Sequence, residues 1–381
     1  MSNKPNLSIS SIAIGAGGAE KVISLLLKKL ISDYNVTLIL LYNEIHFPIP
    51  EEINVVILNK NGIPRSFLSK VVDPIKFIFK YQVTLKKNNI SYAIAFLPLP
   101  CFLNGLAATF NPKITTIISE RGFPSDNTTS KLSFYIARLF YPLLYNRCDK
   151  LFSNSVYINK DLKENFGVKI PMKVIYNPVE IPQNIIKPKK YNNKVHQLKI
   201  INVGTLNVRK NQSLIINAIK KIDKTIQLTI LGEGPLKSEL TDLVNDLNLS
   251  DRIFLEGPKL NVNDYLFVSD CFVLSSRTEG FPNALLEAMA IGLPTISTNC
   301  LSGPLELINE NEKCFIANGE FFLAKYGILI NNDDDMALAK AITYLYENPN
   351  ELIRYGQLSL TRAKEYSLDN IYNQLNKFVQ N

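Results

Sequence analysis

Short apolar runs that stop at a glycine-containing turn, each followed by a stretch with helical spacing, recur along the chain. LSISSIAI at 7–14 leads into GAGGAEKV, LKIINV at 198–203 into GTLNVRKN, and CFVLSS at 271–276 into the EGFPNALLEAM stretch. Strand, turn and helix repeated in this order predict an α/β protein with parallel sheets. Ligands of such sheets bind at the carboxyl ends of the strands, opposite helix N-termini. The turns are therefore the places where functional residues are expected.

The chain is too long for one hydrophobic core. At 381 residues, two domains are expected. The segment 182–197 is rich in Lys, Asn and Pro and carries few apolar residues, as is typical of a linker. We predict a first domain over 1–181, this linker, and a second domain over 198–365.

The EGFPNALLE stretch carries the most specific pattern. A helix that starts after the loop would direct the backbone amides of Asn283, Ala284 and Leu285 outward, where they and the helix dipole can hold a phosphate. Glu279 precedes this helix and Glu287 lies inside it, so they are not predicted to act as an acid/base pair. Each carboxylate can accept two hydroxyl hydrogen bonds, one set from a sugar and the other from a ribose. A solvent-facing Glu287 is the alternative.

Two further turns carry groups that suit phosphates. Arg209 and Lys210 stand just before a predicted helix, where charge-assisted contacts to a diphosphate are expected, although a solvated pair is the alternative. Gly17 and Gly18 permit close backbone approach to a phosphate, or simply make a tight turn. A third glycine is not at the position that a dinucleotide fingerprint needs, so the nicotinamide interpretation is weak.

Glu120 and Arg121 follow the predicted strand 114–118 and would lie at its carboxyl end. We expect Glu120 to orient an acceptor hydroxyl and Arg121 to lie near a phosphate. A structural ion pair is an equally open alternative.

Together these motifs resemble those of retaining glycosyltransferases of family 4, which have the GT-B fold. EGFPNALLE looks like the E-x7-E motif, GGAE resembles the family's first glycine turn, and Lys210 matches the lysine of the G-R-x-x-x-x-K pattern, whose arginine position is Thr205 here. The resemblance covers nearly the whole chain. It implies two doubly wound Rossmann-like domains facing a central cleft, with a C-terminal helix at about 366–381 crossing back to the first domain.

The resemblance also implies roles for single residues. Glu279, Lys210 and Arg209 would be catalytic, and Gly17, Gly18, Glu120 and Arg121 would serve the acceptor or its phosphate. The implied donor site comprises Gly204, Thr205, Arg209, Lys210, Glu256, Glu279, Gly280, Phe281, Asn283, Ala284, Leu285 and Glu287.

The implied reaction is transfer of a hexose or N-acetylhexosamine from a nucleoside-diphosphate sugar, expected to be a UDP-sugar, with retention and without a cofactor or metal. The acceptor would be a hydroxyl of a lipid-linked surface glycan such as lipopolysaccharide, O-antigen or capsule. The alternatives are an epimerase or polymer synthase of the same fold, or a non-catalytic subunit of a glycan assembly complex.

Charge is divided unevenly along the chain. Residues 1–181 hold 21 basic and 12 acidic side chains, a net charge of +9, whereas residues 182–381 have a net charge of −1. Because no nucleic-acid recognition motif accompanies the basic half, an anionic membrane surface is the favoured partner and no nucleic acid is expected.

The segment 66–87 is basic and aromatic at helical spacing, with a break predicted at Pro74. Its outward face is predicted to carry the lysines that would contact lipid head groups, while Phe77 and Phe79 insert. Those lysines are Lys70, Lys76, Lys80, Lys86 and Lys87. A helix that faces the core with these lysines solvated is equally open.

Several other classes of protein are disfavoured. No signal peptide is expected at the start, where the chain leads directly into a predicted strand. Prolines interrupt the uncharged run 88–112, so no transmembrane helix is expected either. Five scattered cysteines indicate reduced thiols, and the aspartates 333–335 are predicted to begin a helix instead of binding a metal. We therefore expect a cytoplasmic protein that associates peripherally with the inner face of the cell membrane.

Overall fold

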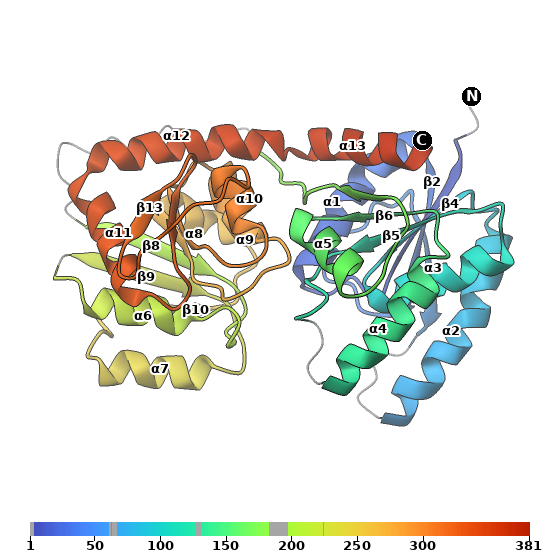
Figure 1. The fold of residues 1–381 in the computed structure, drawn as a ribbon, viewed down its shortest axis with the longest axis horizontal. Helices are drawn as coiled ribbons and strands as arrows, with labels where there is room; N and C mark the ends of the chain where they lie inside the picture. The colour runs from blue at the N-terminus through green and yellow to red at the C-terminus, as the bar shows by residue number, and fades with distance from the viewer. Residues whose placement is uncertain (1–3, 61, 63–66, 127–130, 183–196, 224) are drawn as a thin grey trace. The chain divides into compact units, whose positions relative to one another are not determined.

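The computed structural model describes residues 4–60, 62, 67–126, 131–182, 197–223 and 225–381, with only the backbone for 67–72 and 131–133. The chain divides into two compact units. The first is Met1–Pro178 with Leu368–Asn381, and the second is Val179–Ser367. Nearly all of the predicted linker, residues 183–196, lies outside the described residues. Figure 1 shows that each unit has a central sheet with helices on both faces, so the predicted α/β fold class is confirmed.

The first unit is built on a seven-stranded, wholly parallel sheet with the order β3-β2-β1-β4-β5-β6-β7. Its strands are β1 Asn6–Ser11, β2 Asn35–Tyr42, β3 Asn54–Asn59, β4 Tyr92–Phe96, β5 Thr115–Glu120, β6 Lys150–Ser153 and β7 Met172–Val174. The central strands are buried along almost their whole length, as in a sheet covered on both faces.

The helices of the first unit are α1 Gly18–Asp33, α2 Phe67–Lys87, α3 Pro98–Phe110, α4 Lys131–Tyr145, α5 Val156–Glu164 and α13 Leu368–Gln380. α3 packs between α2 and α4. A Cβ added at Gly105 of α3 would lie 2.2 Å from the carbonyl oxygen of Leu144, so only glycine fits where α3 and α4 meet. The predicted break at Pro74 was wrong, because α2 continues through this residue.

The C-terminal helix α13 belongs to the first unit and packs on α1. Its buried face consists of Leu368, Ile371, Tyr372, Leu375 and Val379. Polar contacts add to this packing, including Lys29 with Asp369 at 2.5 Å and Tyr34 with Asn376 at 2.5 Å. A segment from the end of the chain thus completes the first core.

The second unit repeats the arrangement with the strand order β10-β9-β8-β11-β12-β14-β13. Its strands are β8 Leu198–Val203, β9 Ile226–Leu231, β10 Ile253–Gly257, β11 Cys271–Leu274, β12 Thr295–Thr298, β13 Phe321–Leu323 and β14 Ile328–Ile330. All neighbours are parallel except β13 and β14, an antiparallel pair at one edge.

Its helices are α6 Gln212–Lys220, α7 Lys237–Asp246, α8 Val262–Val268, α9 Asn283–Ala290, α10 Pro304–Asn309, α11 Asp335–Glu347 and α12 Pro349–Glu365. Aliphatic side chains from the sheet, α6 and α11 form one continuous core. As predicted, the aspartate run begins a helix: Asp334 caps α11 by accepting from the amide of Ala337. In the part of the chain that the structure describes, no helix meets the length and apolarity needed to cross a membrane.

Candidate functional site

The order of strands in the second sheet reverses between β8 and β11, and the loops that follow these two strands meet there. Lys210, after β8, places its Nζ 2.5 Å from Oε1 of Glu279, which follows β11. Arg209 Nη1 lies 3.5 Å from the other carboxylate oxygen. Ligands of open α/β sheets bind at such reversal points, outside the carboxyl ends of the strands. The structure therefore brings together the three residues predicted to be catalytic.

The Glu279 carboxylate is held tightly within this cluster. The residue is only 3% exposed, and the Ser276 hydroxyl donates to Oε1 at 2.5 Å. A buried carboxylate needs such partners, because removal of a charge from water is costly unless it is paired and hydrogen-bonded. The cation side is more open, since about half of the Arg209 side chain is exposed. The cluster thus presents positive charge outward over a buried counter-ion.

The glycine turn after β8 leaves room beside Lys210. A Cβ at Gly204 would meet nothing closer than the Lys210 side chain at 3.6 Å, whereas a Cβ at Gly232 would lie 2.0 Å from the Gly204 carbonyl oxygen. The Gly204 carbonyl therefore leaves room only for glycine at position 232, whereas the space at position 204 does not itself require glycine. Thr205, which stands at the arginine position of the family pattern, is exposed next to this open side.

A third loop, after β12, fixes the backbone of Glu279. The Glu279 amide donates to the Leu301 carbonyl at 2.8 Å, and the Ser302 amide donates to the Glu279 carbonyl at 3.0 Å. The Ser302 hydroxyl also donates to the Gly280 carbonyl at 2.7 Å. At Gly303, with φ +98°, a Cβ would lie 2.5 Å from Pro282, so the close approach of the two loops requires glycine.

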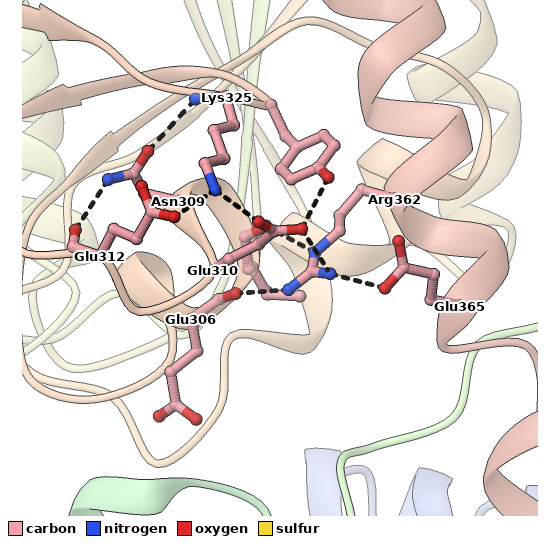
Figure 2. Close-up of polar contacts among 9 residues, drawn as sticks. Glu306, Asn309, Glu310, Glu312, Lys325, Arg362 and Glu365 are labelled. Atoms are coloured by element: carbon pink, nitrogen blue, oxygen red, sulfur yellow. Dashed lines mark hydrogen bonds and ion pairs between the residues drawn. The ribbon is translucent and has the colours of Figure 1, made fainter.

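Helix α10 leads away from this third loop and is held by Arg362 of α12, as Figure 2 shows. The Arg362 guanidinium donates to the carbonyls of Glu306 at 2.8 Å and Leu307 at 3.1 Å. Glu310 and Glu365 flank the same guanidinium at 3.6 Å and 2.6 Å. This largely buried arginine ties α12 to α10.

Helix α9 begins at Asn283, as predicted, but one of its amides is occupied. The Asn283 amide donates to the Phe281 carbonyl at 3.0 Å, so the expectation that it points to a ligand was wrong. The amides of Ala284 and Leu285 stay predictions. Glu287 is half-buried inside the helix, while Phe281 is buried and its ring lies 6.1 Å from that of Tyr366.

Glu256 is the last residue but one of the edge strand β10. Its carboxylate pairs with Lys259 at 3.0 Å, and both side chains are partly exposed. Lys210 and Glu279 pair with each other instead. The predicted place of Glu256 near the base of the donor stays a prediction.

In the first unit, Gly17 and Gly18 stand where β1 gives way to α1. Gly17 is the N-cap of α1, with Glu20 in the first turn. A Cβ at Gly17 would lie 2.3 Å from a Glu20 carboxylate oxygen, so the glycine lets this side chain fold back over the turn. Burial, with a smaller contribution from the nearby Glu44, raises the pKa of the Glu20 carboxyl.

β5 runs to Glu120, beyond the predicted strand end at 118, and Arg121 follows it, but both side chains are buried. Burial raises the pKa of the Glu120 carboxyl to about 7, although the Tyr145 hydroxyl, which donates at 3.0 Å, opposes this change. Arg121 donates to Asn177 at 2.7 Å and lies over the rings of Phe96 and Phe152 at 5.0 and 4.9 Å. These internal contacts support the structural alternative for both residues.

Sequence reasoning missed several residues of the second-unit site. Ser276 and Ser302 hold Glu279, and Arg277 pairs with Asp333 at 2.9 Å. Ser276 and Arg277 lie next to the EGFPN loop, so their closeness in sequence to Glu279 was the available signal. Asp333 carried none, because it lies 56 positions from Arg277 and reaches it only through the fold.

Two family models match the chain. One, described as Glycosyltransferase Family 4, matches residues 16–182, and the other, Glycosyl transferases group 1, matches residues 183–359. Each match covers the core of one unit, and the second contains Lys210, Glu279 and Glu287.

The chain is a family-4 glycosyltransferase.

Curated relatives of this glycosyltransferase match along almost its whole length. A Campylobacter jejuni protein named N-acetylgalactosamine-N,N'-diacetylbacillosaminyl-diphospho-undecaprenol 4-alpha-N-acetylgalactosaminyltransferase is 28% identical, over 94% of this chain and 95% of that protein. A second transferase of Campylobacter jejuni, named as acting on GalNAc-alpha-(1->4)-GalNAc-alpha-(1->3)-diNAcBac-PP-undecaprenol, is 23% identical, over 98% of both chains.

Solved structures confirm the GT-B fold of this glycosyltransferase. The lipopolysaccharide outer core galactosyltransferase WaaB is similar with a TM-score of 0.73 and 20% identity, over 98% of both chains. HepE of Anabaena, solved in complex with UDP and glucose, is similar with a TM-score of 0.74 and 15% identity, over 99% of both chains.

Proposed function

We propose that this glycosyltransferase transfers a hexose or N-acetylhexosamine from a UDP-sugar to a hydroxyl of a lipid-linked surface glycan. The observation that carries the proposal is the meeting of Arg209, Lys210 and Glu279 where the second sheet reverses its strand order. A diphosphate bound here would lie against two cations at the carboxyl ends of β8 and β11.

The two cations supply what the reaction needs most. As the bond from the sugar to the diphosphate breaks, negative charge builds on the leaving group and positive charge on the sugar ring. Lys210 and Arg209 are already fixed beside Glu279, so they can stabilise that charge without reorganising. We propose that these side chains take the place of a metal ion, and that the reaction retains the configuration of the transferred sugar.

Glu279 would play two parts in succession. Before a donor binds, its carboxylate is the counter-ion of Lys210, at 2.5 Å. A diphosphate carries more negative charge and would compete for the same ammonium group. Glu279 would then be free to accept a hydroxyl hydrogen bond from the sugar, while Ser276 keeps its carboxylate in place.

The names of the relatives support the acceptor. Both Campylobacter jejuni proteins are named for transfer to saccharides carried on undecaprenol through a diphosphate, and WaaB is named for the outer core of lipopolysaccharide. HepE was solved with UDP, which supports a uridine donor. We propose by extension that the acceptor here is a lipid-linked glycan of the same class.

A binding experiment tests the donor site. Thermal unfolding would be followed with uridine, guanosine and adenosine diphosphates and their sugars, with EDTA present, for the wild type, Lys210→Met and Lys221→Met. Lys221 is a matched control, because it is an exposed lysine of the same unit that pairs with Asp335. We expect a uridine nucleotide to raise the unfolding temperature of the wild type and to raise that of Lys221→Met equally. In Lys210→Met the shift should be smaller, by an amount that corresponds to at least about tenfold weaker binding.

The outcomes separate the alternatives. No shift with any nucleotide contradicts the transferase proposal and favours a non-catalytic subunit. Release of a free epimer without acceptor would identify an epimerase. For the reaction itself, NMR of the product gives the anomeric configuration, and loss of activity in EDTA would contradict the proposed independence from metal.

We further propose that the first unit rests on an anionic bilayer at the inner face of the cell membrane. Two of its helices, α2 and α4, both lie against α3 (Figure 1). Each of the two exposes apolar side chains. The exposed residues are Ile75, Phe79 and Val83 of α2 and Tyr135, Ile136, Leu139, Phe140 and Leu143 of α4. The expectation that Phe77 inserts into lipid was wrong, because this ring is 1% exposed and packs in the core.

Basic side chains accompany this apolar surface. Lys76, Lys86, Lys87 and Arg138 are exposed on the same two helices, so the surface suits acidic head groups above an apolar layer. Lys80 is less available, since its Nζ donates to the Leu58 carbonyl at 2.6 Å. The side chain of Lys70 lies outside the described residues.

Flotation with lipid vesicles tests this surface. We expect the wild type to float with vesicles containing phosphatidylglycerol and not with phosphatidylcholine alone, and Phe79→Ser/Leu139→Ser to lose most of the flotation. Leu260→Ser is the control, because Leu260 of the second unit is 98% exposed. Equal flotation of all three proteins contradicts the proposal. A wild-type dimer that becomes monomeric in the double variant would assign the surface to a second copy instead.

A further inference from the structure

We propose that the ion pair between Arg277 and Asp333 is a positioning device that sets Arg209 and Lys210 for the donor diphosphate. This inference rests on the proposed function. Arg277 follows β11 and Asp333 follows β14, so the pair joins two loops at the same edge of the second sheet. Neither residue was predicted to take part in the site.

Each nitrogen of the Arg277 guanidinium has an acceptor in the protein. Its Nε and Nη2 each lie 2.9 Å from Oδ1 of Asp333, and its Nη1 donates to the Val208 carbonyl at 2.9 Å. Its backbone amide donates to the Arg209 carbonyl at 2.8 Å. Because each guanidinium nitrogen already has an acceptor, Arg277 is arranged to hold the loop.

Asp333 also holds the next residue of the loop, Asn211. Its Oδ1 also accepts from Asn211 Nδ2 at 2.9 Å. Asn211 and Asp333 both adopt the left-handed backbone conformation, which residues other than glycine rarely take, with φ +51° and +59°. Asn211 directly follows Lys210 and caps α6, so the direction in which the chain leaves Lys210 depends on a residue that Asp333 holds.

The contacts form a continuous series along the loop. Arg277 holds the carbonyls of Val208 and Arg209, the Ser275 hydroxyl donates to the Lys210 carbonyl at 2.8 Å, and Asp333 holds Asn211. Each of the four residues 208–211 is therefore fixed from outside the loop.

Stability alone does not explain the pair. The Arg277 and Asp333 side chains are 40% and 55% exposed, and an exposed ion pair adds little to folding stability. What it does change is the freedom of the loop that carries the two cations. Small displacements of charged groups weaken binding and catalysis strongly, so the effect is expected in the site and not in the melting temperature.

A positioning role and a simple electrostatic effect predict opposite changes in diphosphate affinity for Asp333→Asn. The substitution removes a negative charge near the site of an anion, so the field alone would strengthen diphosphate binding. If Asp333 holds Arg277 and Asn211 in place, its loss loosens the loop and weakens binding. The sign of the change therefore identifies the mechanism.

The test uses the full chain and UDP as the probe, with GDP and ADP if the wild type prefers them. Dissociation constants would be measured by calorimetry for Asp333→Asn, Arg277→Ala, their double variant and Asp335→Asn. Asp335 is the matched control, since it lies in the same aspartate run and pairs with Lys221 at 3.6 Å. We expect about tenfold weaker binding in each single variant, a loss in the double variant that is clearly smaller than the product of the two single losses, and a change within about twofold in Asp335→Asn.

Hydrogen exchange of the amides in 207–211 gives a second readout that needs no ligand. We expect faster exchange there in Asp333→Asn and Arg277→Ala, with the rest of the second unit unchanged. Tighter or equal binding in Asp333→Asn together with unchanged exchange would overturn the inference. If the wild type binds no nucleoside diphosphate, the proposed function fails, and the exchange rates alone decide whether the pair positions the loop.

Discussion

Glu120 is a carboxyl group without access to water, and its surroundings set how stability depends on pH. Tyr145 and Arg121 contact it, and Cys101 and Tyr141 lie close enough to interact with its charge. Burial raises the pKa of this carboxyl from 4.5 to about 7 in the folded protein. The folded state therefore binds a proton that the unfolded state releases, and this contribution to stability is lost as the pH rises from about 4.5 through about 7.

Replacing Glu120 by glutamine removes this dependence. We expect the free energy of unfolding of the wild type to fall relative to Glu120→Gln between pH 5 and pH 8, by about 1–3 kcal/mol. The slope is the readout, because the amide also changes the hydrogen bonds with the Tyr145 hydroxyl and the Arg121 backbone amide, an offset that is present at every pH. Urea titrations at four pH values measure it, and parallel pH profiles of the two proteins would show that the carboxyl is ionised throughout.

Single residues were predictable where their neighbours in sequence carried the signal. Lys210, Arg209 and Glu279 each stand in a loop that follows an apolar run, and they meet in the second unit. Arg277 and Asp333 could not be paired in advance, because hydrogen bonds between distant loops follow from the fold and leave no periodicity. The Asn283 amide was also misjudged, since a local bond to Phe281 depends on backbone angles.

At the scale of elements, the contact between α3 and α4 depends on one glycine. A methyl group at Gly105 would lie 2.2 Å from the Leu144 carbonyl oxygen, which is backbone and cannot move away by rotating. Alanine is favoured over glycine in a helix by up to about 1 kcal/mol, while overpacking costs about 1–3 kcal/mol or more. We expect the steric term to win, so Gly105→Ala should lower the free energy of unfolding by about 2 kcal/mol.

Chemical denaturation of Gly105→Ala measures this effect. Gly62→Ala is the control, because a Cβ at Gly62 meets nothing within 4 Å. The control should be neutral or stabilised by up to about 1 kcal/mol. A Gly105→Ala variant as stable as the wild type would mean that the two helices separate at little cost.

Helix α2 shows why an element can be predicted while its orientation cannot. Apolar residues occupy two of its faces: Phe77, Tyr81 and Leu85 are buried, and Ile75, Phe79 and Val83 are exposed. Both series have helical spacing, so the sequence predicts a helix without deciding which face meets the core. The neighbouring α3 decides it. The three-residue strands β13 and β14 were also missed, because segments this short carry no periodicity.

For the whole molecule, the alternation of strand, turn and helix was enough to predict two α/β units. The resemblance further implied a C-terminal helix on the first domain, and α13 lies there. Exact limits were not predictable: the first unit ends at Pro178 and resumes at Leu368, whereas 181 and about 366 were expected. The two limits are adjacent in the structure, since Val179 and Ser367, the first and last residues of the second unit, pair in a β-bridge.

This arrangement predicts that a substitution near the C-terminus destabilises the N-terminal unit. Leu375 of α13 and Leu345 of α11 are both fully buried, but each belongs to a different core, because α13 packs on α1 and α11 on α6. Truncating either to alanine should cost about 2–5 kcal/mol. Hydrogen exchange followed along a denaturant series separates the units, because each can open without the other. We expect Leu375→Ala to accelerate exchange in 4–178 and in α13, and Leu345→Ala to accelerate it in 197–367. If Leu375→Ala instead accelerated exchange equally in both units, the two units would unfold together. The two cores would then not be independent in stability.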